Sequence, residues 1–100
     1  MQEQMGKNKI HYATESRRDL DEIWDYIAYN LQNVSAAERI VNRIMNDVDH
    51  LENHAEMGTP LSSIANVESA SRFLVPGNYL TFYRVSGSDV YVDRILSARR

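Results

Sequence analysis

Cysteine is absent from this chain of 100 residues. Its absence excludes a disulfide framework, a thiolate nucleophile and any zinc site with cysteine ligands, and it is typical of a reducing compartment. Two prolines and four glycines leave little room for a linker or a low-complexity tract. No apolar run approaches the roughly 20 residues that cross a bilayer, and the polar N-terminus lacks the apolar core of a secretory signal. We therefore expect one domain over residues 1–100, with residues 1–8 flexible, in the cytoplasm and away from the membrane.

Positive charge is scarce overall and unevenly distributed. The formal net charge is −3, which disfavours a general nucleic-acid coat. Residues 1–60 hold 6 basic and 11 acidic side chains, whereas residues 61–100 hold 5 basic and 3 acidic ones. All the basic residues of the second part are arginines. The C-terminal part is therefore where we expect contact with an anionic partner.

Hydrophobic periodicity predicts two helices. A helical stripe of apolar residues, with acidic residues near its start, predicts a helix over Glu15–Leu31. A second stripe follows Ser35, and Ser35 with Glu38 fits a capping box that opens a helix. We expect this second helix to reach Asn53 or Ala55. The short connection predicts that the two form an antiparallel helical hairpin.

The remaining segments favour strands. Lys9–Thr14 is the first predicted strand. Residues 58–71 read as a loop that is long for so compact a domain, which leaves room for a strand or a short turn within it. Turn-forming residues separate three further predicted strands, over Arg72–Val75, Tyr79–Val85 and Val90–Leu96. The predicted fold is α+β, a helical hairpin packed on one face of a mostly antiparallel sheet, in the order β-α-α-β-β-β.

Pairing Val85 with Val90 divides the last hairpin into two faces. The mostly apolar face is predicted to lie under the helices and comprises Tyr79, Thr81, Tyr83, Val85, Val90, Val92, Arg94 and Leu96. The other face mixes apolar and charged groups and is the candidate working face, with Leu80, Phe82, Arg84, Tyr91, Asp93 and Ile95. A register slip of one residue would exchange the faces of one strand.

Arg94 is the charged member of the face predicted to lie under the helices. A buried arginine needs a carboxylate partner. Asp19 or Glu22 of the first helix is in position to supply one, so the sequence predicts a structural ion pair.

Aromatic and histidine side chains receive mostly structural interpretations. Trp24 lies in the middle of the first helical stripe and is predicted to be core. Tyr26 and Tyr29 lie off that stripe, where they are available to a partner, although single exposed aromatics are also common. His50 and His54 have a metal-compatible spacing, but no third ligand is evident. We therefore expect no metal and no cofactor.

Three stretches resemble RelE/ParE-type toxins: Arg17–Ala28 resembles their first helix, Tyr79–Val85 their central strand, and Val90–Arg100 their last strand with its basic end. The resemblance extends from about Ile10 to Arg100. It implies the toxin half of a type II toxin–antitoxin pair, a growth-inhibiting protein of the plasmid-stabilisation type, which a cognate antitoxin holds inactive.

The resemblance implies one of two activities. ParE-type members poison DNA gyrase, whereas RelE-type members are enzymes that cut messenger RNA on the ribosome. The RNA cutters often carry an arginine where this chain has Leu80, and a histidine where it has Ser97; serine cannot replace histidine as an acid or base near pH 7. The chain also stops at Arg100, before any C-terminal tyrosine. These departures favour the ParE activity, with RNA cleavage or a non-toxic antitoxin-binding module as alternatives.

Candidate site residues come from the sheet and the basic end. The candidates for catalysis are Arg99, Arg84 and Arg72, since Arg99 lies where the RNA cutters carry a phosphate-contacting arginine. The candidates for target binding are Arg100 and Tyr91. The candidates for antitoxin binding are Leu80, Phe82, Arg84 and Ile95, with the helical hairpin as the other candidate surface.

Overall fold

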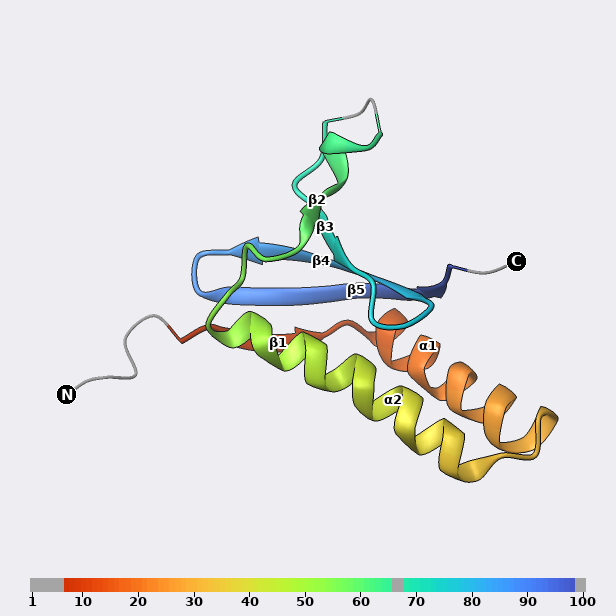
Figure 1. The fold of residues 1–100 in the computed structure, drawn as a ribbon. Helices are drawn as coiled ribbons and strands as arrows, with labels where there is room; N and C mark the ends of the chain where they lie inside the picture. The colour runs from red at the N-terminus through yellow and green to blue at the C-terminus, as the bar shows by residue number, and fades with distance from the viewer. Residues whose placement is uncertain (1–6, 66–67, 99–100) are drawn as a thin grey trace.

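A computed structural model describes residues 7–65 and 68–98 of the chain. Two helices and a five-stranded sheet form an α+β fold in the predicted order (Figure 1). The strands are β1 (Lys9–Tyr12), β2 (Thr59–Pro60), β3 (Arg72–Leu74), β4 (Tyr79–Ser86) and β5 (Asp89–Ser97). The helical elements are α1 (Thr14–Asp25), the π-helix η1 (Tyr26–Asn30), α2 (Val34–Asp49), and the 3-10 turns η2 (His50–Glu52) and η3 (Leu61–Ser63). The short β2 and η3 are the structure expected within the long loop.

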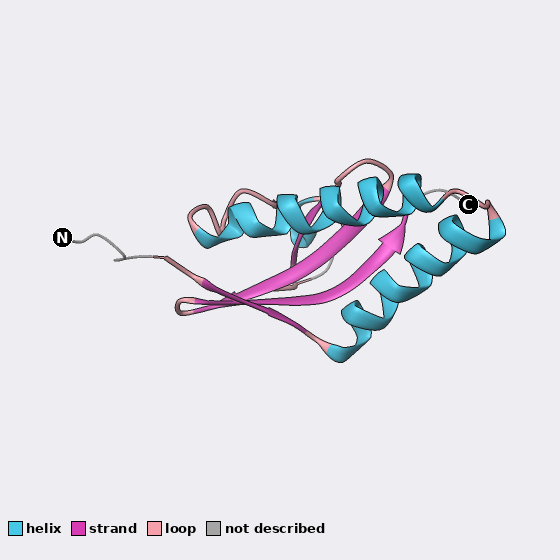
Figure 2. Ribbon diagram, turned by 90° about the horizontal axis from the view of Figure 1, so that it is seen from below, coloured by secondary structure: helices cyan, strands magenta, loops and turns pink. Residues whose placement is uncertain are grey.

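The sheet has the strand order β1-β5-β4-β3-β2. β1 pairs with β5 in parallel, and the other neighbours pair antiparallel. Both helices lie on the same side of this sheet (Figure 2), and in the described structure neither covers the opposite face (Figure 1). The first strand ends at Tyr12 rather than Thr14, because Thr14 already belongs to α1. No described helix is long and apolar enough to cross a membrane.

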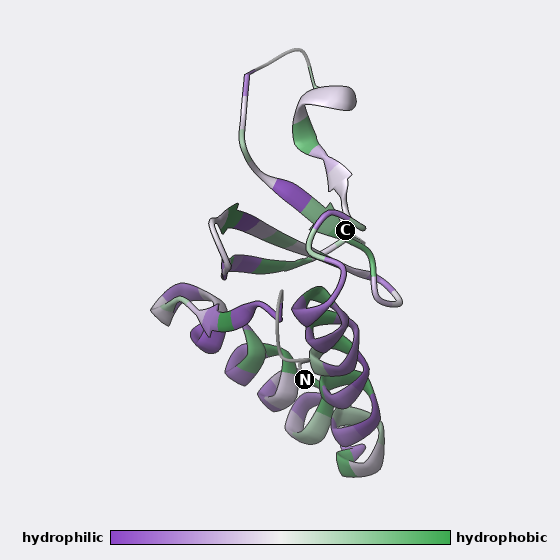
Figure 3. Ribbon diagram, turned by 90° about the vertical axis from the view of Figure 1, so that its left-hand side faces the viewer, coloured by the Kyte–Doolittle hydropathy of each residue, from purple (hydrophilic) through white to green (hydrophobic). Residues whose placement is uncertain are grey.

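The hydrophobic core lies between α2 and the middle of the sheet. Three side chains of α2 and η2, Ile44, Val48 and Leu51, are fully buried against Tyr83 and Val92. Both helices carry apolar and polar residues along their lengths (Figure 3), as expected for helices that bury one face. The strands contribute β-branched and aromatic residues to this layer, which suits a half-buried pleated surface.

A second, smaller cluster closes the helical hairpin beyond the sheet. It is formed by Ile27, Ala28, Ala36 and Ala37, and Trp24 packs against it while partly buried. Alanines let the two helices approach closely at this end. Trp24, which was predicted to be core, is only partly buried and packs against this distal cluster, not against the one under the sheet.

The turn between the helices differs from its prediction. α1 continues as the π-helix Tyr26–Asn30, and Gln32 then adopts a positive φ of 53°. The N-cap of α2 is Asn33, whose side-chain oxygen accepts a hydrogen bond from the backbone N–H three residues later. Ser35 lies inside the first turn, and its hydroxyl donates a hydrogen bond to the side-chain oxygen of Asn33. The predicted capping box is therefore wrong, since the helix begins two residues earlier, with Asn33 as its N-cap in place of Ser35. Asparagine and serine are equally good N-caps, so local propensity does not distinguish them.

The predicted register of the last hairpin is confirmed, since Val85 pairs with Val90. An irregularity follows further along, between Phe82 and Tyr83 of β4. There β5 inserts one extra residue, Asp93, which has no partner across the ladder. Such a β-bulge breaks the strict alternation of side chains between the two faces.

The bulge reverses the faces predicted for the end of β5. Ile95 lies opposite Thr81 and is only 2% exposed, so it belongs to the core and not to the open face. Leu96 lies opposite Leu80 and is 38% exposed, so it is not part of the core under the helices. Both predictions were wrong for one physical reason, since they assumed an uninterrupted two-residue period.

Candidate functional site

Five side chains form a connected row across the open face of the sheet. The Oδ1 of Asp89 lies 2.9 Å from the Nε2 of His11, and the His11 ring stacks on Tyr91 with 5.0 Å between ring centroids. On the other side of Tyr91, the Arg84 guanidinium lies 5.3 Å from the ring centroid. Arg84 also donates two hydrogen bonds to the Asp93 carboxylate, at 2.8 and 3.2 Å. The predicted neighbours Arg84 and Tyr91 are thus brought together.

The charged and aromatic groups of this row already have partners within the row. The hydrogen bond from Arg84 to Asp93 raises the pKa of Arg84 above its ordinary value, so the guanidinium stays charged but is matched by a carboxylate. Tyr91 has His11 on one side and Arg84 on the other. A planar base would have to displace one of them to stack on this ring. The bulged residue Asp93 is therefore what neutralises the arginine of the candidate working face.

Arg72 does not join Arg84. Arg72 pairs across the sheet with Tyr83, whereas Arg84 is the next residue of β4 and points to the opposite face. The Arg72 guanidinium donates to two backbone carbonyls, those of Glu56 at 3.1 Å and Gly58 at 2.9 Å. Arg72 therefore holds the segment between α2 and β2 against the sheet edge. The candidates Arg99 and Arg100 lie outside the described residues.

The structure changes the candidate antitoxin surface of the open face. Leu80 and Phe82 remain partly exposed there, and Phe82 contacts Phe73 with 6.0 Å between ring centroids. Ile95 is buried and is unavailable to a partner. Leu96, which takes its place beside Leu80, is the residue that the sequence pattern missed.

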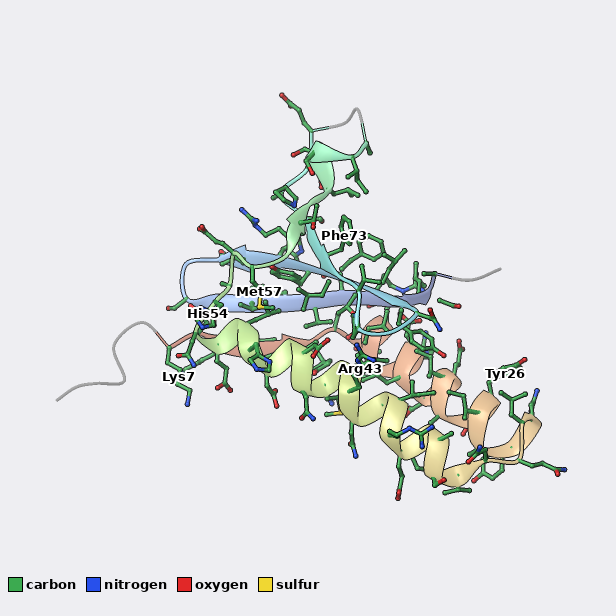
Figure 4. All side chains as sticks on the ribbon, viewed as in Figure 1. Lys7, Tyr26, Arg43, His54, Met57 and Phe73 are labelled. Atoms are coloured by element: carbon green, nitrogen blue, oxygen red, sulfur yellow. The ribbon has the colours of Figure 1, made fainter. Side chains whose placement is uncertain are left out.

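A groove of about 950 Å³ separates the helical hairpin from the end of the sheet. Its apolar lining includes Ile23, Tyr26, Ile27 and Leu31 of the hairpin, with Tyr79 and Leu96 of the sheet. Arg43 of α2 lies at this groove near the turn between β3 and β4 (Figure 4). No sequence period could predict the groove, because its walls come from segments far apart in the chain.

An ion pair forms part of the groove wall. The Arg94 guanidinium donates to both carboxylate oxygens of Asp19, at 2.8 and 3.0 Å, and the backbone N–H of Ile95 donates to the same carboxylate at 2.8 Å. The predicted pairing of Arg94 with α1 is confirmed, but its predicted place under the helices is wrong, since the bulge puts Arg94 opposite Phe82, where its side chain is exposed. The buried partner, however, is Asp19, at 7% exposure, while the Arg94 side chain is 49% exposed. Burial acts to raise the pKa of Asp19, but the hydrogen bonds from Arg94 and Ile95 hold it below its ordinary value.

The histidines do not cluster on the open face of the sheet or in the groove. His50 has its Nδ1 2.9 Å from the carbonyl oxygen of Asn46, one turn back along α2. Among the described residues, no group of three or more histidine, aspartate or glutamate side chains is placed to hold a metal ion. His11 was not predicted to join the row, because its place depends on the parallel pairing of β1 with β5.

Comparisons with known proteins add two findings. A family model described as "ParE toxin of type II toxin-antitoxin system, parDE" matches residues 10–100. A solved structure of the "Chromosomal ParDE TA system from P. aeruginosa" contains a chain with a similar fold, at a TM-score of 0.78 and 22% sequence identity, over 94% of this chain and 99% of that one. No curated protein sequence matches this chain.

Proposed function

Since this chain belongs to the ParE toxin family of type II toxin–antitoxin systems, we propose that it acts in the cytoplasm as a poison of DNA gyrase and is held inactive by a cognate antitoxin. The observation that carries the proposal is the match of the ParE model to residues 10–100. The fold similarity to a chain of a ParDE structure is consistent with it.

The arrangement of arginines supports gyrase poisoning over RNA cleavage. Cutting RNA through its 2′-hydroxyl needs a base, an acid and cations around the phosphate. In the described structure Arg84 is matched by Asp93, Arg94 by Asp19, and Arg72 by backbone carbonyls. A poison that works by binding needs no such catalytic set. RNA cleavage and a non-toxic antitoxin-binding module remain the alternatives.

The groove supports the proposed antitoxin neutralisation. Antitoxins that fold on their toxin must bury apolar area to offset the cost of ordering. The groove offers such area on both walls, with Arg43 and Arg94 beside it. We therefore place the antitoxin in the groove in preference to the open face of Leu80, Phe82 and Arg84.

Growth and gyrase assays together test the proposed function. Induced expression of the chain alone should arrest bacterial growth, and co-expression with the neighbouring small gene should restore it. The purified protein should then inhibit gyrase supercoiling and trap cleaved DNA, without cutting messenger RNA on ribosomes. Activity only in the ribosome assay would replace gyrase poisoning with RNA cleavage. Normal growth at confirmed expression, with antitoxin binding retained, would favour the non-toxic module.

Charge reversal tests the position of the antitoxin. Arg43→Glu should weaken antitoxin binding roughly tenfold or more, because a hydrogen bond to a charged group is worth about 1.5–3 kcal/mol and tenfold is about 1.4. Arg39→Glu, one turn earlier on α2 and outside the groove lining, is the matched control. Arg84→Glu reports on the open face. A loss of affinity with Arg84→Glu alone would move the antitoxin to the sheet.

A further inference from the structure

The end of the helical hairpin exposes large apolar side chains. Among the described residues, nine large hydrophobic side chains are exposed, and four of them lie here: Tyr26 at 56%, Tyr29 at 68%, Leu31 at 56% and Val34 at 53%. This end projects well beyond the sheet (Figure 1), and Tyr26 lies close to it (Figure 4). Single exposed apolar residues are ordinary, but a concentration of them in one short segment indicates an interaction site.

The fold leaves more than half of each of these four residues exposed. The hairpin is closed by its own small cluster of Ile27, Ala28, Ala36 and Ala37. The π-helix interrupts the regular α-helical phase of the segment, and Leu31, the last residue of the predicted first helix, is 56% exposed. Single π-helical turns are frequent at functional sites. The result is a firmly packed support with an apolar outer surface.

Charges around this end select the kind of partner. Residues 22–38 contain Glu22, Asp25 and Glu38 and no lysine, arginine or histidine, while Arg39 follows directly and Arg43 and Arg94 line the adjoining groove. None of these three forms an ion pair with a described residue. Phosphates of nucleic acid and anionic lipid would be repelled, and a second copy would place like charges together. An apolar pocket with a basic rim on another protein complements both properties.

We propose that the hairpin end, Tyr26–Val34, is the surface through which the toxin docks onto the protein part of its target, in an apolar pocket with a basic rim. This inference rests on the proposed toxin function. Tyr26 and Leu31 also line the groove. An antitoxin in the groove therefore covers part of the docking surface, which explains how one bound segment blocks the target. Tyr29 lies outside the groove lining and contacts only the target.

Alanine substitution of Tyr29 separates docking from antitoxin binding. Tyr29→Ala should lower gyrase inhibition and cellular toxicity roughly tenfold or more, as expected for an exposed tyrosine at the centre of an interface. Its antitoxin affinity and thermal midpoint should stay at wild-type values. Tyr29→Phe should keep most of the activity. Ile64→Ala is the matched control, since Ile64 is 66% exposed but lies in the segment after η3.

Each outcome bears on the docking surface separately from the proposed function. Full activity of Tyr29→Ala, or an equal loss with Ile64→Ala, would overturn the docking surface while leaving the toxin assignment intact. If the Tyr29→Ala protein fails to fold, Val34→Ser takes its place. Full activity of Val34→Ser, or an equal loss with Ile64→Ala, would then overturn the docking surface. Wild-type protein that neither arrests growth nor inhibits gyrase would instead refute the proposed function. Asp25→Arg should also reduce gyrase inhibition, because it places a positive charge against the proposed basic rim of the partner's pocket. Unchanged gyrase inhibition would contradict that basic rim.

Discussion

Replacing Asp19 with alanine removes the carboxylate that joins α1 to the end of β5. In the native structure this carboxylate accepts three hydrogen bonds, two from Arg94 and one from the backbone N–H of Ile95. Arg94 is well exposed, so water replaces its share at little cost. The N–H of Ile95 is buried and would lose its acceptor. That loss determines the size of the effect.

A buried donor left without a partner costs about 1–3 kcal/mol. We therefore expect Asp19→Ala to lower the free energy of unfolding by about 1–3 kcal/mol. For a domain of this size the melting midpoint falls by roughly 4–8 °C per kcal/mol. Asp19→Asn should lose less, because its amide oxygen still accepts a hydrogen bond from Ile95. Asp21→Ala, on an exposed position of the same helix, should stay within about 0.5 kcal/mol of wild type.

The pH dependence gives an independent readout of the same residue. The folded state holds the pKa of Asp19 below its ordinary value of 3.8. Between the two values the unfolded chain binds more protons, so stability rises with pH. The contribution of Asp19 is complete above the ordinary value and is lost as pH falls through the folded one. Asp19→Asn should therefore lose less stability on acidification than wild type.

Urea denaturation at neutral and acid pH measures both effects. An Asp19→Ala protein as stable as Asp21→Ala would refute the reasoning, because it would mean that the Ile95 N–H finds another acceptor or is not buried. Identical acid sensitivity of wild type and Asp19→Asn would refute the lowered pKa. The two results are separable, since the first depends on a backbone donor and the second on a charge.

Three further predictions address other parts of the molecule. Tyr83→Phe should cost about 1–3 kcal/mol in urea denaturation, because the Tyr83 hydroxyl accepts from the Gly58 N–H at 2.9 Å in a buried position. Gln32→Gly should raise stability by about 0.5–1 kcal/mol, because the positive φ of 53° strains glutamine but not glycine; an unchanged melting midpoint would argue against that strain. Replacing Arg99 and Arg100 together with alanine should leave melting within about 0.5 kcal/mol and abolish toxicity, and a fully toxic double variant would remove them from the target-binding surface.

The sequence was informative wherever one period governed a segment. Helical stripes predicted both helices, and turn residues predicted the last hairpin with its Val85–Val90 pairing. The prediction failed at Asp93, where the bulge shifts every following side chain of β5 to the other face. No glycine or proline marks that position. Local patterns report the backbone of one element, whereas a bulge depends on how two strands curve against each other.

The candidate site was likewise predictable only where its residues belong to one hairpin. Arg84 and Tyr91 are close because they share one hairpin, and the sequence sufficed to predict that. The groove and the row through His11 depend on contacts between segments far apart in the chain. Asn33 shows a milder limit, since several residues in a polar turn are good helix caps and local propensity cannot choose among them.

The end of β5 explains why the groove lies where it does. β1 stops at Tyr12, opposite Val92, so the remainder of β5 has no strand beside it on that edge. An uncovered edge leaves backbone donors unpaired. Here Asp19 of α1 takes the place of the missing strand for Ile95, and its carboxylate also binds Arg94. The helix is thereby fixed beside the sheet at this point while its far end continues past the last strand. The groove is the space between that departing hairpin and the sheet, so the residue that stabilises the edge also sets the position of the proposed antitoxin site.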